Sequence, residues 1–326
     1  MWAAFLVAVC VLFLAILVDV VLGEPSWKPP YTFHPTVWIY KLTKKLLPYF
    51  RSKNTTVEKL SGVFLALAVI LVFVVPTYFL LKAVNSLLGA LFYVPLAAVI
   101  LKTTFVIKME TDWARTAAKQ IQENNLSKAR EIASMFSRRD TSNLTGQEVA
   151  SALIESIAEN LTDFKLSPFF YYALFGVPGA VTFRVINTLD GTVGFKDPEN
   201  IHIGWFSASL DTLANYIISR LSTILIVLSS FLLNENACDA WRIAVRDRKK
   251  IASINHGWPM AAMAGALHVK LEKADYYAVG DKIEDLSPTH IYSAMKIRNV
   301  SLVLFLLLVV LPILLCLSLV GYFPLI

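Results

Sequence analysis

Three carboxylates recur at every fourth residue of one polar stretch: Glu155, Glu159 and Asp163. In a helix this spacing stacks them along one face, where like charges repel by about 0.2–0.5 kcal/mol per pair. The nearest basic residue in the sequence is Lys165. A divalent cation would relieve the repulsion, and magnesium is commonly held by one or two carboxylates together with phosphate oxygens. The alternative, a solvated helix face, stays open at this point.

The helix that would carry these acids has a well-specified start. Thr145 and Glu148 have the spacing of a capping box, and Leu144 and Val149 that of a hydrophobic staple. Apolar residues then recur every fourth position, at Val149, Leu153, Ile157 and Leu161. This period predicts a helix over 146–163, with an apolar stripe roughly opposite the acidic face.

Further polar residues lie close to this helix in the sequence. Arg138, Arg139 and Asp140 come just before it, and Asn160 lies beside the acids. Arginine can bind phosphate or carboxylate through two parallel hydrogen bonds. A basic pair of this kind can also serve as an anchor beside a membrane. We take all four residues as candidate site residues, with the anchor as the alternative for the arginines.

Two other segments offer weaker candidates. Asn187 and Asp190 could add ligands, although both residue types are also common in turns. His256 precedes Gly257-Trp258-Pro259, which reads as a helix start because proline is tolerated in the first turn. His34 precedes Pro35 and reads as a loop histidine. The sequence contains no glycine-rich phosphate loop, no dinucleotide fingerprint and no serine elbow.

The composition indicates a polytopic membrane protein. Of 326 residues, 56% are hydrophobic and only 17% are charged, with a mean hydropathy of +0.59. Four stretches lack Asp, Glu, Lys and Arg altogether: 1–18, 60–81, 83–101 and 299–326. Runs of about twenty apolar residues match the hydrocarbon thickness of a bilayer. The net charge of +6 comes from basic residues beside these runs, and no basic helix interleaved with aromatics suggests nucleic-acid binding.

We therefore predict an all-α protein with a single integral membrane domain over 1–326. Four full spans are expected, at about 1–22, 60–81, 83–102 and 299–322. The apolar segment 221–233 is interpreted as re-entrant or buried, because about thirteen residues fall short of a span. The segment 166–186 is interpreted in the same way, because prolines and glycines interrupt it. If neither crosses, the polar region 103–298 lies in the cytoplasm; if both cross, 187–215 faces outward.

Two N-terminal features complete the organisation. Asp19 interrupts the end of the first apolar run, where an acid lies either at the water interface or toward the protein interior. Residues 37–50 read as a short amphipathic helix of the kind that lies at a membrane surface. The three cysteines have neither a disulfide framework nor a metal-ligand spacing.

Ordered motifs along nearly the whole chain resemble those of one known family. They are Asp19…Gly23-Glu24-Pro25, His34-Pro35, Arg139-Asp140-Thr141, Ile154-Glu155-Ser156-Ile157-Ala158-Glu159-Asn160, Ser167-Pro168-Phe169-Phe170-Tyr171, Phe175-Gly176-Val177-Pro178-Gly179-Ala180, Asn187-Thr188-Leu189-Asp190 and Gly257-Trp258-Pro259-Met260. In these motifs the chain resembles the membrane-bound adenosylcobinamide-phosphate synthases of cobalamin biosynthesis.

The resemblance implies an ATP- and Mg²⁺-dependent ligase. Such synthases join a free propionate of adenosylcobyric acid to aminopropanol, or to its phosphate, through an amide bond. The resemblance also implies a multi-pass protein of the cell membrane with its polar site in the cytoplasm. Other membrane enzymes of cobalamin assembly are implied as possible partners, and nucleic acid is not.

The roles implied for individual residues follow from matching these motifs. The metal ligands would be Glu155, Glu159 and Asp163, with Asp140 or Asp190 as further ligands. Phosphate or propionate would be bound by Arg138 and Arg139, and the corrinoid by Trp205, Trp258 and Tyr171. His256 and His34 are candidate proton acceptors, and Asn160 and Asn187 complete the candidate catalytic set.

The chain departs from the family pattern between residues 207 and 220. Ala208-Ser209-Leu210-Asp211-Thr212 stands where the family has Ala-Arg-Leu-Asp-Asp, and Ile218-Ser219-Arg220 where it has Pro-Ala-Arg. These changes leave room for an altered amine substrate or a lost activity. The main alternative is a non-catalytic membrane sensor or assembly relative. A transporter would use broken helices at mid-membrane, for which 166–186 is the only hint.

Overall fold

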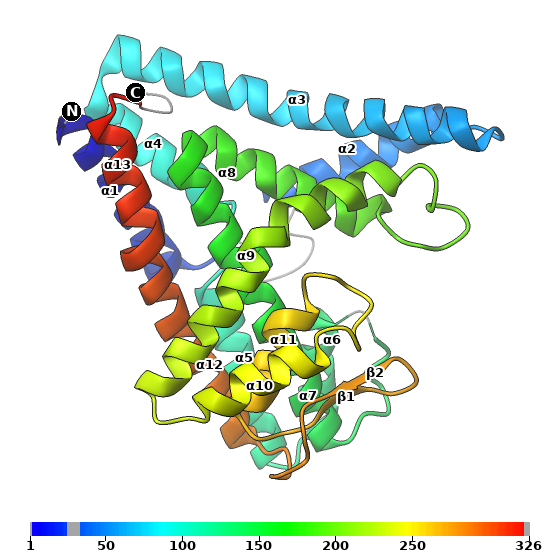
Figure 1. The fold of residues 1–326 in the computed structure, drawn as a ribbon. Helices are drawn as coiled ribbons and strands as arrows, with labels where there is room; N and C mark the ends of the chain where they lie inside the picture. The colour runs from blue at the N-terminus through cyan, green and yellow to red at the C-terminus, as the bar shows by residue number, and fades with distance from the viewer. Residues whose placement is uncertain (1, 25–32, 138, 323–326) are drawn as a thin grey trace. The chain divides into compact units, whose positions relative to one another are not determined.

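The computed structural model describes residues 2–24, 33–137 and 139–322. Its helices are α1 (Trp2–Leu22), α2 (Pro35–Phe50), α3 (Thr55–Leu88), α4 (Ala90–Lys102), α5 (Lys108–Gln122), α6 (Leu126–Phe136), α7 (Gly146–Leu161), α8 (Ser167–Val193), α9 (Trp205–Leu232), α10 (Ala237–Asp247), α11 (Gly257–Ala266), α12 (Pro288–Phe305) and α13 (Leu311–Leu319) (Figure 1). Two π-helical turns, Thr162–Leu166 and Leu306–Val310, join α7 to α8 and α12 to α13. The all-α prediction is confirmed.

The described residues add one small feature that helical periodicity does not predict. Strands β1 (Leu271–Lys273) and β2 (Tyr277–Val279) pair antiparallel, with Leu271 opposite Val279 and Lys273 opposite Tyr277. Each strand has only three residues, which is too short for the alternation that marks a strand in sequence.

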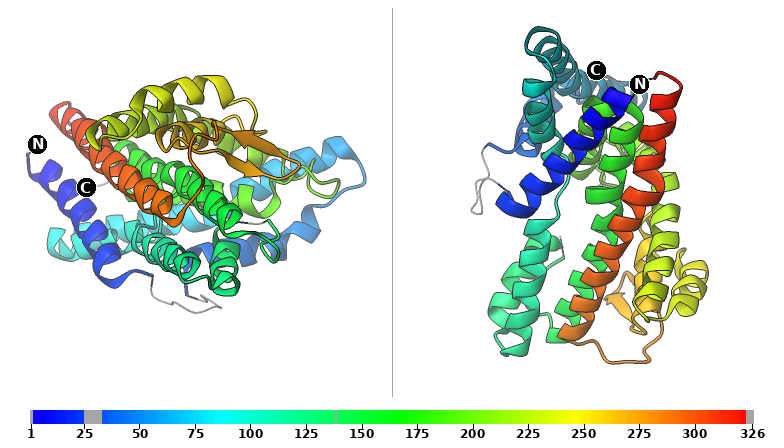
Figure 2. Two further views of the ribbon diagram at one scale, coloured as in Figure 1. Left: turned by 90° about the horizontal axis from the view of Figure 1, so that it is seen from below. Right: turned by 90° about the vertical axis from the view of Figure 1, so that its left-hand side faces the viewer.

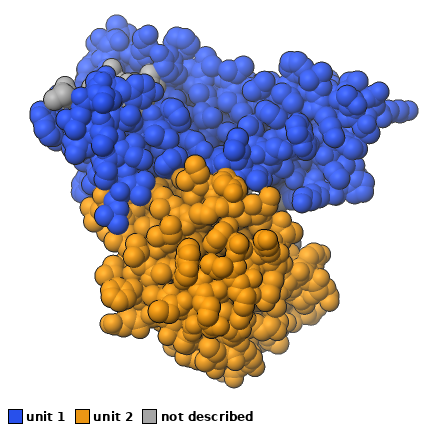
Figure 3. Space-filling view, viewed as in Figure 1, with its two compact units in different colours: residues 1–106, 167–214, 308–326 blue, residues 107–166, 215–307 orange. Residues whose placement is uncertain are grey.

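The chain forms two compact units, coloured separately in Figure 3. Unit 1 contains Met1–Val106, Ser167–Ala214 and Leu308–Ile326, and unit 2 contains Ile107–Leu166 and Asn215–Leu307. The chain passes between them four times. No linker-like composition marks these passages, since the helical segments 146–193, 205–232 and 288–319 each continue through one. The single integral domain expected from the sequence stays a prediction.

In unit 1, helices α2, α3 and α8 pack around a common apolar core. Its buried residues are Ile39, Leu47, Leu65, Ala66, Val69, Val185, Leu189, Val193 and Ile203. Helix α2 buries Ile39 and Leu47 while Trp38 and Tyr40 are about half exposed, which confirms an amphipathic helix here. His34 caps this helix by accepting a hydrogen bond from the Thr36 amide, at 3.2 Å. His34 is therefore an N-cap rather than a simple loop residue.

Five described helical segments are long and apolar enough to cross a membrane, judged by length and composition. They are Trp2–Leu22, Thr55–Leu88, Gly146–Val193, Trp205–Leu232 and Pro288–Leu319. Three of them contain the spans expected at 1–22, 60–81 and 299–322. In the other two, half or more of the most apolar window is buried inside the protein, against 17–28% in the first three. Those two therefore have the burial of interior helices.

The region expected to hold a span at 83–102 is built differently. Helix α3 continues through Lys82 to Leu88, and the break falls at Gly89, whose φ of 72° suits glycine. The remaining helix, α4, has 13 residues and is about 20 Å long, shorter than the roughly 30 Å of a bilayer core. The charge of Lys82 is compatible with a continuing helix because lysine is a good helix former.

The two short apolar segments, 166–186 and 221–233, lie within the longer helices α8 and α9. For α9 the length argument for re-entry therefore does not apply, since the helix has 28 residues. Helix α8 is interrupted at Gly176, with φ 66° and ψ −161°, a conformation that only glycine adopts readily. Pro178 follows and reinforces the kink, because it lacks the amide that would bond to the preceding turn.

In unit 2, α7 is the central helix. It packs against α5, α6, α11, α12 and strand β1, as the views in Figures 1 and 2 show. The capping box of Thr145 and Glu148 is present, and the stripe Val149, Leu153, Ile157 and Leu161 is fully buried. The predictions of where this helix starts and of its apolar face are therefore confirmed.

A buried ion cluster connects three elements of unit 2. Glu110 on α5 accepts from Lys165 at 2.7 Å and from the Arg298 guanidinium of α12. Lys165 and Arg298 are fully buried and Glu110 is 4% exposed. Lys165, which lies nearest to the acidic helix in sequence, thus binds another acid. Charges withdrawn from water need such partners, because desolvation costs several kcal/mol per ion.

We expect Glu110→Gln to destabilise the protein by about 3–5 kcal/mol, since it leaves two buried cations without their carboxylate. Denaturant unfolding in detergent measures the change. Glu123→Gln, on the exposed turn after α5, is the matched control and should cost at most about 1 kcal/mol. Equal stability of the two variants would contradict the role assigned to Glu110.

Acid should weaken the same cluster. Burial alone would raise the pKa of Glu110, but the charges of Lys165 and Arg298 outweigh it and hold the pKa below its usual 4.5. A carboxyl with a lowered folded pKa stabilises the fold above its unfolded pKa and loses that contribution as pH falls through the folded value. Acid titration followed by circular dichroism should therefore show a flatter stability curve for Glu110→Gln than for wild type. Parallel curves would count against this linkage.

Candidate functional site

Helix α7 presents its carboxylates into the protein rather than to water. Glu155 is 3% exposed and Asp163, in the π turn that follows, is 6% exposed; Glu159 between them is partly exposed. A solvated helix face would leave all three open to solvent. The alternative of a solvated face therefore does not describe this helix, and each buried carboxylate needs donors or cations.

Glu155 is the centre of a buried hydrogen-bond cluster. Its Oε1 accepts from the Ser151 hydroxyl at 2.6 Å, and its Oε2 accepts from the Tyr277 hydroxyl at 2.7 Å. The Arg139 guanidinium forms an ion pair with the same Oε2. Arg139 also donates to the carbonyl oxygen of Glu272 in β1, at 3.2 Å. The hairpin and the segment before α7 are thus both tied to one carboxylate.

The Tyr277 phenol is strongly affected by this environment. Burial and the neighbouring Glu155 carboxylate raise its pKa well above the usual 10. Tyr277 therefore stays protonated and remains a hydrogen-bond donor to Glu155. Tyr277 and Ser151 are site residues that the sequence reasoning missed. Ser151 carried a usable signal, since it lies one helical turn before Glu155 on the same face.

One turn further along, Glu159 and Asp163 meet His256, the residue before α11. His256 Nδ1 lies 3.2 Å from Glu159 Oε1, and Nε2 lies 3.2 Å from Asp163 Oδ2. One ligand atom from each residue lies within 4.8 Å of the other two. We call these three residues the carboxylate–histidine cluster.

The carboxylate–histidine cluster fits a divalent cation. An imidazole carries at most one positive charge, whereas the two carboxylates beside it carry two negative charges. A bound cation would complete the neutralisation. Carboxylates suit Mg²⁺ and Mn²⁺, whereas imidazole is more typical of transition metals. Mn²⁺ is therefore a suitable probe for this donor set.

The acidic face is thus divided into two parts. The sequence predicts one metal set of Glu155, Glu159 and Asp163, but Glu155 is bound by Arg139 and Tyr277, while Glu159 and Asp163 share His256. The spacing along α7 did not reveal the compensating groups, because they come from residues distant in sequence. Arg138 lies outside the described residues.

Three other candidate residues of unit 2, Asp140, Asn160 and Trp258, have contacts of their own. Asp140 is exposed, and its Oδ1 accepts from the Ser142 amide at 2.9 Å, which lowers its pKa. The carbonyl oxygen of Asn160 lies 3.5 Å from Lys165 Nζ. Trp258, in the first turn of α11, packs under the guanidinium of Arg248. Among the described residues, Asp140 has no hydrogen bond or ion pair with Glu155, Glu159 or Asp163.

Asn187 and Asp190 lie in unit 1, within α8, so the turn interpretation of these residues is wrong. Asn187 donates to Asp211 Oδ1 at 3.1 Å and accepts from Arg184 Nη1 at 3.0 Å. Asp211 is the acid that this chain keeps where it departs from the family pattern. Its buried position and its bond to Asn187 indicate a structural reason for keeping it.

A second buried charge cluster in unit 1 involves the N-terminal motif. Lys102 Nζ lies 2.5 Å from Glu24 Oε1 and 3.6 Å from Asp19 Oδ1, and His34 Nε2 lies 3.2 Å from Glu24 Oε2. Burial raises the pKa of Glu24, but the His34 hydrogen bond and the Lys102 charge outweigh it and lower the pKa. Asp19 is fully buried, so of its two interpretations the interior one is confirmed.

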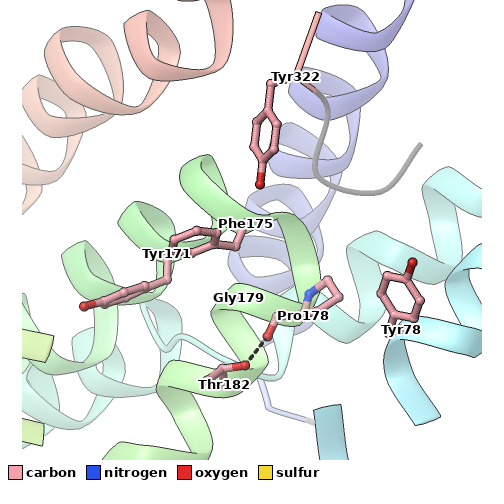
Figure 4. Close-up of a pocket in the computed structure, with 7 residues that line it drawn as sticks. All are labelled: Tyr78, Tyr171, Phe175, Pro178, Gly179, Thr182 and Tyr322. Carbon is pink, nitrogen blue, oxygen red and sulfur yellow. Dashed lines mark hydrogen bonds between the residues drawn. The ribbon is translucent and has the colours of Figure 1, made fainter. Parts of the chain in front are cut away.

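Tyr171 belongs to an aromatic pocket of unit 1, shown in Figure 4. The pocket has a volume of about 560 Å³ and is lined by Tyr78, Tyr171, Phe175, Pro178, Gly179, Thr182 and Tyr322. The Tyr171 ring stacks on Phe183, with centroids 5.4 Å apart, and its hydroxyl donates to the Ala214 carbonyl. Trp205, at the start of α9, is 50% exposed.

Comparison with known proteins identifies close relatives. The model of the family described as "CobD/Cbib protein" matches residues 12–317. A relative from Thermoplasma acidophilum, named "Probable cobalamin biosynthesis protein CobD", is 38% identical over 307 residues, 93% of this chain and 97% of the relative. One of the same name from Methanothermobacter thermautotrophicus is 36% identical over 297 residues, 91% and 95% of the two chains.

A third relative extends the likeness to bacteria. The "Cobalamin biosynthesis protein CobD" of Dehalococcoides mccartyi is 33% identical over 287 residues, covering 88% of this chain and 91% of the relative. No solved structure matches this chain. The likeness therefore covers both compact units and all the clusters described above.

The division of the acidic face predicts a specific pattern of metal binding. Mn²⁺ binding, measured by electron paramagnetic resonance on protein in detergent, should weaken at least roughly tenfold in Glu159→Gln and in His256→Gln, since loss of even an outer-shell partner commonly costs that much. Glu155→Gln should keep its Mn²⁺ affinity because Arg139 and Tyr277 already occupy Glu155. Loss of binding in Glu155→Gln as well as in Glu159→Gln would instead favour the ligand set predicted from the sequence.

Proposed function

The chain belongs to the CobD/Cbib family, whose relatives are named as cobalamin biosynthesis proteins, and from this premise we propose that it catalyses an amide-bond-forming step. The acid would be the free propionate of adenosylcobyric acid, and the amine would be aminopropanol or aminopropanol phosphate. The product is adenosylcobinamide or its phosphate. The reaction consumes ATP and requires a divalent metal, for which Mg²⁺ is the physiological choice.

One observation supports this proposal most directly. Along α7 and the π turn that follows it, two clusters succeed each other: Glu155 pairs with Arg139, and Glu159 and Asp163 lie against His256. Activation of a carboxylate by ATP needs positive charge where the phosphoryl group is transferred. A non-catalytic relative has no need of a buried site with this composition.

The balanced reaction has two steps. A propionate oxygen attacks the terminal phosphorus of ATP, so that a C–O–P linkage forms and ADP leaves. The amine nitrogen then attacks the acyl carbon, the C–N bond forms, phosphate leaves and the amine loses a proton. A bound divalent cation would supply charge stabilisation for the transferring phosphoryl group.

The residues of the chain have separable tasks in this scheme. Glu159, Asp163 and His256 would hold the cation. We assign His256 to this set rather than to proton transfer, because both of its ring nitrogens face carboxylates. Arg139 and Tyr277 hold Glu155 in a fixed rotamer, which keeps α7 and the hairpin in register. Glu155 is thus a positioning residue.

The corrinoid and the membrane enter the proposal through the apolar surfaces. In unit 1, the half-exposed Trp205 offers an aromatic face against which a flat macrocycle can pack, and Tyr171 is a further candidate contact in the same unit. Trp258, the candidate in unit 2, differs because its ring carries arginines. The five long apolar helices support a multi-pass membrane location, and the basic residues beside them favour a cytoplasmic site. Lipid and other membrane enzymes of cobalamin assembly are the proposed surroundings.

The function is tested with purified protein in detergent. With Mg²⁺, ATP, adenosylcobyric acid and aminopropanol phosphate, we expect the amide product by mass spectrometry together with ADP and phosphate. Glu159→Gln should lower the rate by at least roughly a hundredfold, because removal of one charge-stabilising group commonly costs 10²–10³ in rate. The measurement is product formed per unit time at saturating substrate.

The control is Glu131→Gln, an exposed surface acid of α6 that pairs with Lys128. It should keep the wild-type rate. Full activity in Glu159→Gln would sink the assignment of the site. No product from the wild-type protein with either amine would favour the non-catalytic alternative.

A further inference from the structure

Two arginines of unit 2 converge on one tryptophan. The guanidinium carbon of Arg248 lies 4.6 Å from the ring centroid of Trp258, and that of Arg220 lies 5.6 Å from the same ring. Arg220 also packs on Tyr216, at 3.6 Å. Stacking on aromatic rings orients the planar guanidinium groups and holds them in place.

Neither arginine has an acidic partner among the described residues. Every hydrogen bond they form uses Nη1. Arg220 donates to the Tyr216 carbonyl at 2.7 Å, to Asn255 Oδ1 at 2.9 Å and to the Ser219 hydroxyl at 3.0 Å, and Arg248 donates to the Val245 carbonyl. The Nε and Nη2 groups of both are left without a protein acceptor within this part of the chain. These two donors form the edge that binds an oxyanion through parallel hydrogen bonds.

The position of Arg220 in an apolar helix also points to a ligand for its positive charge. It lies in α9, a helix apolar enough to be a candidate membrane span. Charged residues in such helices are costly, face the interior and commonly mark functional sites. Two cations near one ring also repel each other, so an anion bound between them would be favourable.

The segment Asn255–Trp258 connects this arginine pair to the carboxylate–histidine cluster. Asn255 accepts from Arg220, His256 contacts Glu159 and Asp163, and Trp258 carries both guanidinium groups. Gly257 lies so close to the Arg248 carbonyl that an added Cβ would be 2.1 Å from its oxygen. Helices α10 and α11 lie side by side here (Figure 1). Four consecutive residues thus position both clusters.

We propose that Arg220 and Arg248 bind a phosphate group whose remaining oxygens face the cation of the carboxylate–histidine cluster. A phosphate ester carries about −1.5 to −2 charge at neutral pH and three acceptor oxygens, which matches two guanidinium groups with open donor edges. Arg139, the arginine expected from the sequence to bind phosphate, is occupied by Glu155. The proposal rests on the proposed function for the identity of the ligands, which are ATP and the phosphorylated amine.

The test is equilibrium binding to the full chain in detergent, with ATP and aminopropanol phosphate as separate probes. Arg248→Gln and Arg220→Gln should each weaken the binding of one of the two probes at least roughly tenfold, the loss expected for one charged hydrogen-bonding partner. Arg248→Lys keeps the positive charge but loses the planar guanidinium that can donate two parallel hydrogen bonds, and should give an intermediate affinity. Aminopropanol without phosphate should bind equally to all variants.

Arg242→Gln is the matched control, because this exposed arginine of α10 already pairs with Asp239. Loss confined to ATP assigns the site to the nucleotide, and loss confined to aminopropanol phosphate assigns it to the amine; either result supports the proposal. Unchanged affinity for both probes in folded Arg220→Gln and Arg248→Gln overturns it. If the arginine variants bind both probes as wild type does, but wild type still forms the amide, the phosphate site is contradicted and the proposed function stands. If binding depends on the arginines but wild type forms no amide, the phosphate site stands and the proposed function is contradicted.

Discussion

A carboxylate withdrawn from water has to be given donors or a cation, and α7 with the π turn that follows it carries two that are almost fully buried. Much of unit 2 is arranged to meet this requirement. The segment before α7 supplies Arg139, the hairpin supplies Tyr277, and the residue before α11 supplies His256. Elements far apart in sequence are therefore held around one helix by the charges they bring to it, as well as by apolar packing.

Other buried carboxylates of the protein are neutralised by basic side chains of the chain itself. Glu110 is neutralised by Lys165 and Arg298, and Glu24 by Lys102 with His34. In those clusters the acids have cations of the chain itself beside them. The carboxylate–histidine cluster differs, because two carboxylates lie against one imidazole, which carries at most a single positive charge. The arginine pair on Trp258 shows the opposite imbalance, with donors that lack an acceptor. Complementary imbalances on neighbouring residues are the physical basis of a binding site.

Local patterns predicted the central helix well. The capping box, the apolar stripe and the direction of the acidic side all follow from spacings of three and four residues, and α7 has each of them. The partners of its acids could not be predicted in this way, since Arg139 is separated from Glu155 by a loop and Tyr277 by most of unit 2. The hairpin was missed because three-residue strands have no period. The sequence predicted a boundary between the spans 60–81 and 83–102, whereas α3 continues to Leu88 and the break falls at Gly89.

The interleaving of the two units bears on how the protein is made. Unit 1 uses both the first and the last residues of the chain, and unit 2 needs residues up to Leu307. During synthesis, therefore, neither unit has all of its segments until residues beyond 300 have been made. Helix α7, with its buried acids, is made well before residues 256 and 277 that complete its surroundings. In a nascent chain these carboxylates have to stay hydrated until then, so the site assembles as one of the last events of folding.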